Sequence, residues 1–319
     1  MVLSRVSLLK VFNYHTLLAL CALGLIYHFY SLNAASTFGH AAPKDAIVPA
    51  TPRTGEIPKI LWYKLGPRGM TDDTRKWTDS CIQPNPTYRA EFLTDETSDA
   101  WVRKTFSPSR PELVESYLAL SVPIFKADIL RYLLLWDQGG IWSDLDVSCN
   151  GIPIDDWVPA EYKDKANLVV GWEFDQGWEG QYVRQFTSWT IMSAPRSPHM
   201  LQVIDDIFLD LEKITATNDI AVQNVTLALA GDVVDFSGPR RLTRSIYTSL
   251  SNMMNATVGP LDVQEILKPK LVGDVLVMPG KSFAASSNRY TPEQERELPP
   301  SLVTHHYAGS WKNDHGGES

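Results

Sequence analysis

Residues 124–149 read IFKADILRYLLLWDQGGIWSDLDVSC: an apolar helical pattern, two glycines, a short apolar run and then two aspartates separated by one residue. Side chains two positions apart in an extended segment point to the same side, so we expect the carboxylates of Asp144 and Asp146 to lie together. Such hard oxygen ligands hold a divalent ion and leave much of its coordination shell to a diphosphate. An isolated Asp-x-Asp usually marks a solvated turn. Here Asp128 and Arg131, on the helix just before it, favour a binding site.

The composition is that of a globular protein. Of the 319 residues, 44% are hydrophobic and 21% are charged, which is ordinary for a chain that buries a core. The formal net charge of −8 argues against a nucleic-acid-binding protein, which needs a basic surface. A nucleotide ligand is still compatible with this charge, because a divalent ion supplies positive charge locally.

The N-terminal segment predicts a membrane anchor. No Asp, Glu, Lys or Arg occurs from Val11 to Pro43, whereas Arg5 and Lys10 precede this stretch. A membrane-spanning helix needs about 20 apolar residues, and Val11–Leu32 meets that length. The positive charges before it favour a cytosolic N-terminus. The alternative is a cleaved signal peptide with the small residues Ala34-Ala35 at its end.

These features predict four parts of the chain. The segment after the anchor is rich in Ala, Pro, Thr and Ser without periodicity, which is typical of a stem. The predicted parts are a cytosolic tail (1–10), a transmembrane signal anchor (11–32), a stem (33–56) and a lumenal domain (57–319).

The cysteines and glycosylation sequons are compatible with a lumenal domain. Cys21 lies in the apolar N-terminal stretch, which leaves Cys81 and Cys149 as one disulfide in an oxidising compartment or as two buried thiols. Sequons begin at Asn224 and Asn255, and a glycosylated Asn lies at the surface.

Strand and helix patterns alternate along the predicted domain. We expect strands at 57–63, 88–93, 167–173, 189–193, 274–278 and 303–306. We expect helices at 71–81, in the proline-broken stretch 97–138, and at 197–213 and 239–252. This alternation predicts an α/β fold in one domain. In open α/β sheets ligands bind at the carboxyl ends of the strands, and Asp144 and Asp146 fall at such an end.

Three landmarks make the chain resemble the DxD-motif glycosyltransferases. The first is the helix with Asp128 and Arg131, followed by two glycines and Asp144-Leu-Asp146. The others are Ser237-Gly238-Pro239 and the ending His305-His306-Tyr-Ala-Gly-Ser-Trp-Lys312. Together they are similar to the fungal branch of the initiation-specific α-1,6-mannosyltransferase type. Three residues differ from the usual pattern without removing a metal ligand: Ala127 replaces Ser, Trp142 replaces Tyr and Ser237 replaces Thr.

The resemblance implies a fold, an activity and partners. The fold is the nucleotide-diphospho-sugar transferase (GT-A) type, a mixed central sheet flanked by helices. The activity is a metal-dependent, retaining transfer of mannose from GDP-mannose to the mannose core of an N-linked glycan in the Golgi. The implied partners are the nucleotide-sugar donor, the glycan acceptor, the membrane through the anchor and other Golgi mannosyltransferases in a complex. No nucleic acid is expected.

The motif residues carry specific expectations. Asp144 and Asp146 bind Mn²⁺ or Mg²⁺, which offsets the charge of the departing diphosphate. Asp128 and Arg131 either form a helix-face ion pair worth only ~0.3–0.5 kcal/mol, or hold the donor. In the second interpretation, which their position favours, Asp128 accepts hydrogen bonds from sugar hydroxyls and the rigid fork of Arg131 binds a sugar or phosphate oxygen.

Adjacent histidines in a strand face opposite ways, so only one of His305 and His306 can be a metal ligand. The resemblance favours His305. By the same resemblance Lys312 reaches the diphosphate. Trp62 is either a nucleotide contact or a core residue, and Gly238 either covers the phosphates or the acceptor or simply starts a helix. The β-face group and the acceptor contacts are expected in the aromatic-rich stretch that holds Glu173, Asp175, Gln185 and Trp189.

Three alternatives stay open. The acceptor could be inositol phosphorylceramide, although a lipid acceptor favours further membrane segments and none follows residue 32. Ile141–Ser148 also resembles the Asp-x-Asp motif of aspartyl-phosphate phosphatases, with Gly231–Asp235 as a later acidic motif. In that fold, however, the nucleophile lies at the start of the domain. The third alternative is an inactive carbohydrate-binding relative.

Overall fold

The structure is a computed structural model that describes residues 55–178, 180, 182–309, 312–313 and 316. The predicted tail and anchor, and all but the last two residues of the predicted stem, lie outside the described residues. None of the helices in the described part of the chain is long and apolar enough to cross a membrane.

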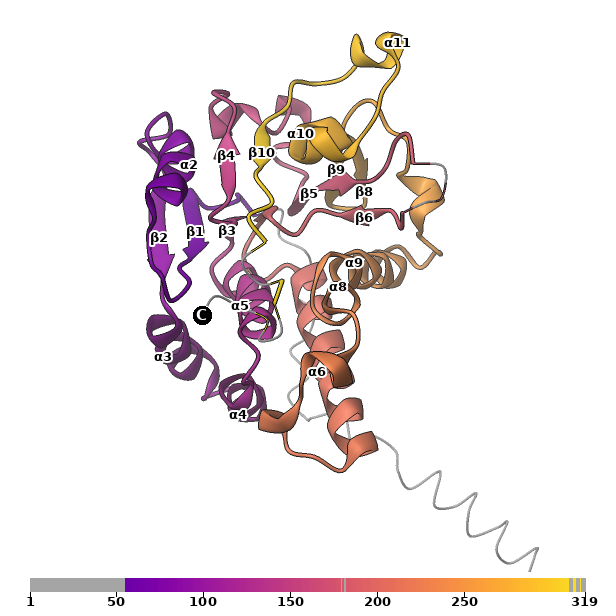
Figure 1. Ribbon diagram of the computed structural model, residues 1–319. Helices are drawn as coiled ribbons and strands as arrows, with labels where there is room; N and C mark the ends of the chain where they lie inside the picture. The colour runs from indigo at the N-terminus through magenta and orange to yellow at the C-terminus, as the bar shows by residue number, and fades with distance from the viewer. Residues whose placement is uncertain (1–54, 179, 181, 310–311, 314–315, 317–319) are drawn as a thin grey trace, which may run out of the picture. The chain divides into compact units, whose positions relative to one another are not determined.

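A mixed sheet of eight strands forms the centre of the described part (Figure 1). Its strand order is β2 (Arg89–Leu93), β1 (Ile60–Lys64), β3 (Gly140–Ser143), β7 (Thr190–Ser193), β5 (Leu168–Glu173), β9 (Val275–Met278) and β8 (Lys270–Val272), with β6 (Gln185–Phe186) paired to β5. β1 runs parallel to β2 and β3, and β5 parallel to β9, whereas β7 is antiparallel to both β3 and β5. A separate antiparallel pair joins β4 (Val147–Cys149) to β10 (Val303–His305).

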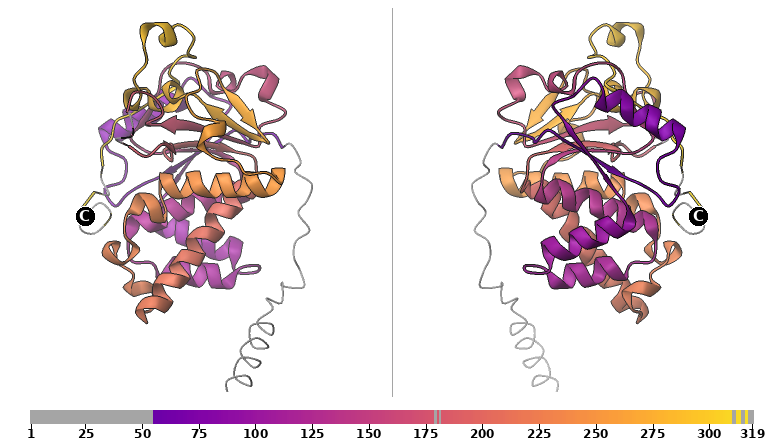
Figure 2. Two further views of the ribbon diagram at one scale, coloured as in Figure 1. Left: turned by 90° about the vertical axis from the view of Figure 1, so that its right-hand side faces the viewer. Right: turned by 90° about the vertical axis from the view of Figure 1, so that its left-hand side faces the viewer.

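Helices cover both faces of the sheet (Figure 2). One face carries α3 (Asp95–Phe106), α4 (Pro111–Ala119), α5 (Pro123–Asp137), α6 (Pro198–Asn218) and α9 (Pro239–Met254). The other carries α2 (Asp72–Ile82) and α10 (Gly280–Ala284). The remaining short helices are α7 (Leu227–Ala230), α8 (Val233–Phe236) and α11 (Pro292–Glu295). The predicted α/β class, with a mixed central sheet flanked by helices, is confirmed.

Helix α5 and the turn after it lead directly into β3, which ends at the candidate site. Pro123 occupies the first helical position, where its missing N–H costs no hydrogen bond. After the C-cap residue Gln138, Gly139 and Gly140 have φ angles of 66° and 100°, which favour glycine. A Cβ on Gly140 would lie 2.8 Å from the carbonyl oxygen of Ile60, so only glycine lets the chain pass this close to β1.

Most predicted elements are present, and the differences have local causes. Helix α3 starts at Asp95 because Thr94 caps it through a capping box with Thr97. Strands β4, β6 and β8 were not predicted, since two or three residues are too few to show a period. The predicted extended conformation at Asp144–Asp146 is wrong. The Val147 N–H donates to the carbonyl of Asp144 at 3.1 Å, which makes this segment a turn between β3 and β4.

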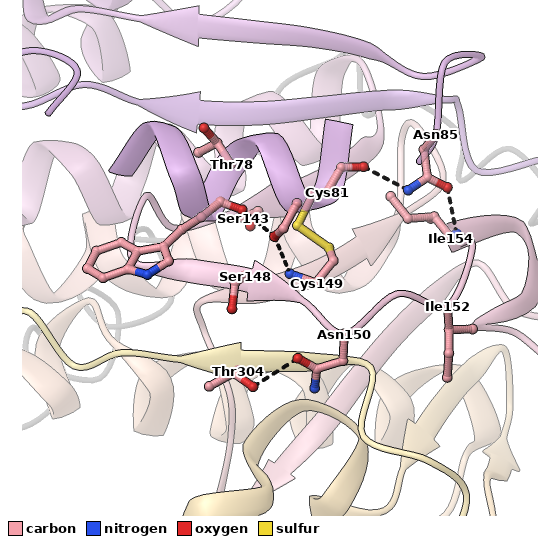
Figure 3. The surroundings of a disulfide bond; sticks show 12 residues. Thr78, Cys81, Asn85, Ser143, Ser148, Cys149, Asn150, Ile152, Ile154 and Thr304 are labelled. Carbon is pink, nitrogen blue, oxygen red and sulfur yellow. Dashed lines mark hydrogen bonds between the residues drawn. A yellow bond between two sulfur atoms is a disulfide. The ribbon is translucent and has the colours of Figure 1, made fainter. Parts of the chain in front are cut away.

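A disulfide fixes the segment after that turn (Figure 3). Cys81 of α2 is bonded to Cys149 of β4, so of the two interpretations of these cysteines the bridge is the one observed. The backbone N–H of Cys149 donates to Ser80 Oγ at 2.9 Å. Helix α2 and strand β4 are therefore tied together by a covalent bond and a hydrogen bond at the same place.

Candidate functional site

Asp144, Asp146 and His305 form one group beside the carboxyl end of β3. Each offers a ligand atom, and these atoms all lie within 4.8 Å of one another. The two aspartates lie on the turn between β3 and β4. Pairing of β10 with β4 places His305 opposite Val147, the residue after Asp146. Two short strands thus bring His305 to a pair of aspartates that lie far from it in the sequence.

Neighbouring groups orient Asp146 and His305. His305 Nε2 is 3.3 Å from Asp146 Oδ1, and the backbone N–H of Ala308 donates to Asp146 Oδ2 at 2.9 Å. The ring of Trp189 stacks on that of His305, with centroids 4.3 Å apart and planes at 15°. The imidazole is therefore held in position from one face by the indole.

His306 points away from this group. Its ring stacks on Trp77 of α2 at a centroid distance of 4.4 Å, and its Nε2 lies 2.8 Å from Ser148 Oγ. As expected for adjacent strand residues, the two histidines face opposite ways, and His305 is the one that the structure brings to the aspartates.

Asp128 and Arg131 lie behind the turn in the interior of the protein. Their side chains are only 4% and 5% exposed, so they do not form a solvated helix-face pair. Arg131 Nη2 is 3.2 Å from Asp128 Oδ1 and 3.3 Å from Asp144 Oδ1. Trp142 Nε1 also donates to Asp144 Oδ1 at 2.6 Å. The arginine therefore links the helix carboxylate to the first aspartate of the motif.

Burial and charge shift the pKa values of this cluster in different directions. Burial raises the pKa of Asp128, although Arg131 and Ser237 oppose the rise. Burial also raises the pKa of Asp144, although Arg131 opposes this. For Asp146 burial acts in the same direction, but His305 and the Ala308 N–H outweigh it and lower the pKa. Asp146 is thus the more easily ionised of the two motif carboxyls.

The turn before α9 supports Asp128. Ser237 Oγ donates to Asp128 Oδ2 at 2.7 Å, and Tyr132 Oη donates to the Ser237 carbonyl at 2.9 Å. Gly238 is the N-cap of α9, with Pro239 in its first turn. A simple helix start, one of the two interpretations of this motif, is therefore present, and contact of Gly238 with the donor stays a prediction.

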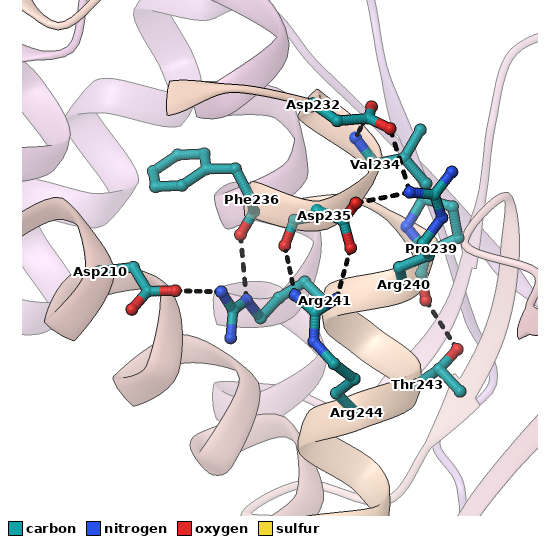
Figure 4. Close-up of polar contacts among 10 residues, drawn as sticks. All are labelled: Asp210, Asp232, Val234, Asp235, Phe236, Pro239, Arg240, Arg241, Thr243 and Arg244. Carbon is teal, nitrogen blue, oxygen red and sulfur yellow. Dashed lines mark hydrogen bonds and ion pairs between the residues drawn. The ribbon is translucent and has the colours of Figure 1, made fainter. Parts of the chain in front are cut away.

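An ionic network fixes this turn from outside (Figure 4). Arg240 pairs with Asp232 at 3.1 Å and also with Asp235. Arg244 donates to the carboxylate and to the backbone carbonyl of Asp235, and Arg241 pairs with Asp210 of α6. All three arginines are on α9, so the helix is anchored to α6 and α8 around the residue that bonds Asp128.

The other predicted residues lie at different depths. Trp62 is 6% exposed and its indole N–H donates to the Gly139 carbonyl at 2.8 Å, which places it in the core; a nucleotide contact for it stays a prediction. Lys312 is exposed and its charge lowers the pKa of Glu173. Lys312 is therefore near the site, and its contact with a diphosphate stays a prediction.

Glu173 lies at the end of β5 and is 4% exposed. Gln185 Nε2 donates to Glu173 Oε2 at 2.8 Å. Burial raises the pKa of Glu173 to about 7, against the opposing influence of Gln185 and His305. Asp175 instead bonds the backbone N–H of Glu265 at 3.0 Å, which gives it a structural role in holding a loop.

Sequence reasoning missed the roles of Trp142 and Tyr307. In the sequence, Trp142 was noted only because it replaces the Tyr that is usual in the motif, yet its indole N–H donates to Asp144. The ring of Tyr307 lies 4.1 Å from that of His305. The position of Trp142 two residues before Asp144 was a usable signal, because side chains two apart in a strand share a side.

The donor set fits a divalent cation. Two carboxylates and an imidazole can hold such an ion and leave the rest of its coordination shell open. The side chains of Asp144, Asp146 and His305 keep 28%, 17% and 12% of their surface exposed, so the group is accessible. Arg131 Nε and Nη1 are buried and have no hydrogen-bond partner among the described residues. Unpaired guanidinium donors on the arginine that also bonds Asp144 suit an anion held by such a cation.

Comparisons with known proteins agree with this site. Residues 71–164 match the family described as "Glycosyltransferase sugar-binding region containing DXD motif". The chain is 30% identical over 285 residues to the initiation-specific alpha-1,6-mannosyltransferase of Schizosaccharomyces pombe, covering 85% of this chain and 68% of the relative. It is 28% identical over 292 residues to the Candida albicans protein of the same name, covering 81% and 73%.

More distant similarities are shorter or weaker. The mannosyl phosphorylinositol ceramide synthase CSH1 of Saccharomyces cerevisiae is 31% identical over 93 residues, which is 29% of this chain and 24% of that protein. Among solved structures, PaToxG glycosyltransferase aligns with a TM-score of 0.42 and 15% identity, covering 76% of this chain and 84% of that chain. Because of its 30% identity to the Schizosaccharomyces pombe protein over most of both chains, the chain belongs to the glycosyltransferase family that carries a DXD sugar-binding region and includes the initiation-specific alpha-1,6-mannosyltransferases.

Proposed function

We propose that this protein is a metal-dependent, retaining mannosyltransferase that moves mannose from GDP-mannose to the mannose core of an N-linked glycan in the Golgi. The observation that carries the proposal is the convergence of Asp144, Asp146 and His305 within 4.8 Å, next to the buried pair of Asp128 and Arg131.

Each residue of the cluster has a part in binding the donor. Asp144, Asp146 and His305 hold the divalent cation, which when bound offsets the negative charge of the nucleotide diphosphate. Arg131, fixed by two carboxylates, directs its unpaired N–H groups to a donor oxygen. Asp128 accepts hydrogen bonds from sugar hydroxyls, and the exposed Lys312 binds the diphosphate.

The extent of similarity supports an N-glycan acceptor over a sphingolipid. The named alpha-1,6-mannosyltransferase matches 85% of the chain, whereas the mannosyl phosphorylinositol ceramide synthase CSH1 matches 29%. The family assignment also favours a transferase over the phosphatase alternative. An inactive relative is not favoured, because the complete metal-ligand group is present.

Nucleotide release by the full-length protein tests the donor. GDP-, UDP- and CMP-sugars are supplied with a mannose-terminated oligosaccharide, with Mn²⁺, with Mg²⁺ and with EDTA. We expect release of GDP from GDP-mannose that EDTA abolishes and Mn²⁺ or Mg²⁺ restores. Asp156→Asn is the matched control for substitutions of the motif aspartates Asp144 and Asp146, since Asp156 is an exposed acid outside the site. Equal turnover of UDP- or CMP-sugars, or full activity in EDTA, contradicts the donor or the metal.

Location is tested separately. Protease treatment of sealed vesicles leaves a lumenal domain intact, and the sequons at Asn224 and Asn255, both at exposed residues, then carry glycan. Digestion of the domain in intact vesicles reverses the proposed topology.

A further inference from the structure

Three aromatic side chains gather at the surface between β5 and β6: Phe174, Trp178 and Tyr182. Phe174 and Tyr182 stack, with centroids 4.6 Å apart and planes at 15°, and Trp178 meets Tyr182 edge-on at 4.5 Å. Despite both contacts Tyr182 is 49% exposed. Phe174 stacks on one face of the Tyr182 ring, and about half of the residue's surface still remains exposed. We call these three side chains the aromatic platform.

Trp178 and the backbone after Phe174 are anchored by polar contacts. Trp178 Nε1 donates to the carbonyl of Ser287 at 2.6 Å, and the guanidinium of Arg289 lies 4.3 Å from the Trp178 ring centroid. Phe174 has a φ angle of 57°, in the left-handed region that a non-glycine residue adopts where its surroundings impose it, often at binding sites. Asn288 Oδ1 accepts the backbone N–H groups of the two residues that follow Phe174.

A chain of contacts connects the platform to the candidate metal group, which consists of Asp144, Asp146 and His305. Ser287, whose carbonyl accepts from Trp178, also has its Oγ 2.5 Å from Tyr307 Oη. The Tyr307 ring contacts that of His305 at 4.1 Å and that of Trp189 at 5.7 Å. One residue therefore contacts both the platform and the segment that carries the histidine of the metal group.

Glu173 directly precedes Phe174 in the chain, and the charge of His305 influences its pKa, so it is linked to both the aromatic platform and the candidate metal group. A buried carboxyl is normally paired with a cation or with several donors. Glu173 is 4% exposed, and among the described residues its one hydrogen-bond donor is the neutral amide of Gln185. The fold alone gives no reason for this carboxyl, whereas a ligand rich in hydroxyl groups supplies the missing donors.

The size of the exposed apolar surface indicates a small ligand. In the described part of the chain, the exposed large hydrophobic residues of this region are Tyr182, Val183 and Tyr307. A stable protein partner needs a far wider surface, of about 800 Å² on each side. A pyranose ring presents an apolar C–H face that fits an aromatic face, and its hydroxyls fit a carboxyl.

We propose that the aromatic platform binds a hexopyranose ring of the acceptor glycan on the open face of Tyr182, and that Glu173 accepts a hydrogen bond from an acceptor hydroxyl at the inner end of this subsite. The subsite rests on the proposed function, because only a transferase to a sugar acceptor requires it.

The test compares Tyr182→Ala with Tyr182→Phe in the full-length protein. With GDP-mannose and a mannose-terminated oligosaccharide, we expect Tyr182→Ala to raise the acceptor KM about five- to tenfold, the range of an aromatic contact, and the donor KM less than about twofold. Tyr182→Phe keeps the ring and should retain the wild-type acceptor KM. Leu209→Ala is the control, since Leu209 is 50% exposed but lies on α6.

A binding measurement without donor gives a second readout. Isothermal titration with α-mannobiose should show binding to the wild type and to Tyr182→Phe, and at least about fivefold weaker binding to Tyr182→Ala. Glu173→Ala should weaken binding about tenfold or more, because the carboxyl is lost as a hydrogen-bond acceptor.

The outcomes separate the two proposals. If the wild type transfers mannose but Tyr182→Ala matches it in acceptor KM, the subsite is wrong and the proposed function stands. If Tyr182→Phe loses as much as Tyr182→Ala, the hydroxyl and not the ring face is responsible, and the stacking is wrong. If the wild type turns over no mannose donor, the proposed function fails and the acceptor subsite fails with it.

Discussion

Asp128 and Glu173 are both buried carboxyl groups close to the candidate metal group, but their surroundings differ. Asp128 has the cationic Arg131 at 3.2 Å and the Ser237 hydroxyl at 2.7 Å. Glu173 has the neutral amide of Gln185 at 2.8 Å. Burial raises the pKa of both groups. Only Asp128 has a full positive charge beside it to oppose that rise at close range.

This difference distinguishes two regions of the site. The region around Asp128 and Arg131 has its charges arranged before any ligand arrives, which suits a doubly charged donor that must be held in one orientation. Around Glu173 the hydrogen bonding is incomplete, because its one side-chain donor among the described residues is the neutral amide of Gln185, which suits an uncharged sugar that supplies the missing hydrogen bonds. Substitutions in the two regions should therefore affect different measured quantities.

The largest effect is expected where the two regions meet, at the metal group. Asp144→Ala or Asp146→Ala should lower kcat at least about 10²–10³-fold, the loss seen when a main electrostatic stabiliser is removed. Both side chains are partly exposed, so the melting temperature should change little. Activity assays and thermal unfolding of each variant measure this. Wild-type turnover with unaltered Mn²⁺ dependence would remove the metal assignment.

Glu173 should make stability depend on pH. Its folded pKa of about 7 is above the unfolded value, so between pH 4.5 and 7 the folded state binds the extra proton and stability falls as pH rises. The contribution is complete below the unfolded pKa and amounts to about 3 kcal/mol, lost by the time pH has passed the folded pKa. Urea unfolding of wild type and Glu173→Gln at several pH values measures the difference. Parallel curves for the two proteins contradict the prediction.

Arg131→Lys should be nearly as harmful as Arg131→Ala. If Arg131 only neutralised Asp128, lysine would restore the charge. If its fork holds a donor oxygen, lysine loses that geometry, at about 1.5–3 kcal/mol or on the order of 10–100-fold in kcat/KM. Asp128→Asn should behave similarly, and the double variant should cost less than the sum because both disturb one subsite. An active Arg131→Lys enzyme returns the pair to a purely structural role.

The smallest effect is expected at Ser237. Ser237→Ala removes the hydroxyl that donates to Asp128 at 2.7 Å, which should cost about 1 kcal/mol of stability. Ser237→Thr keeps a hydroxyl and is the matched control. Chemical denaturation of the three proteins decides, and a loss in Ser237→Thr as large as in Ser237→Ala points to packing instead of the hydrogen bond.

Local signals in the sequence predicted one part of this structure well. Pro123 and the two glycines mark the ends of α5, and the polar residues Asp128 and Arg131 stand out in its apolar pattern. Their burial was not predictable, because it depends on the turn before α9, which bonds Asp128, and on the turn after β3, which pairs with Arg131. The pairing of β4 with β10 was also invisible, since each strand has three residues and the two are far apart in the sequence. The turn at Asp144–Asp146 was missed because Asp-x-Asp after a strand fits both an extended segment and a turn.

The position of His305 has a consequence for the order in which the enzyme is made. A nascent chain that has emerged only as far as residue 300 contains both aspartates and the whole mixed sheet, but it lacks β10 and therefore the imidazole. Since domains begin to fold while the chain is still being synthesised, the sheet can form before the metal group is complete. Pairing of β10 with β4 is thus the last step in assembling the candidate metal group, and under the proposed function we expect a product terminated before Val303 to lack transferase activity.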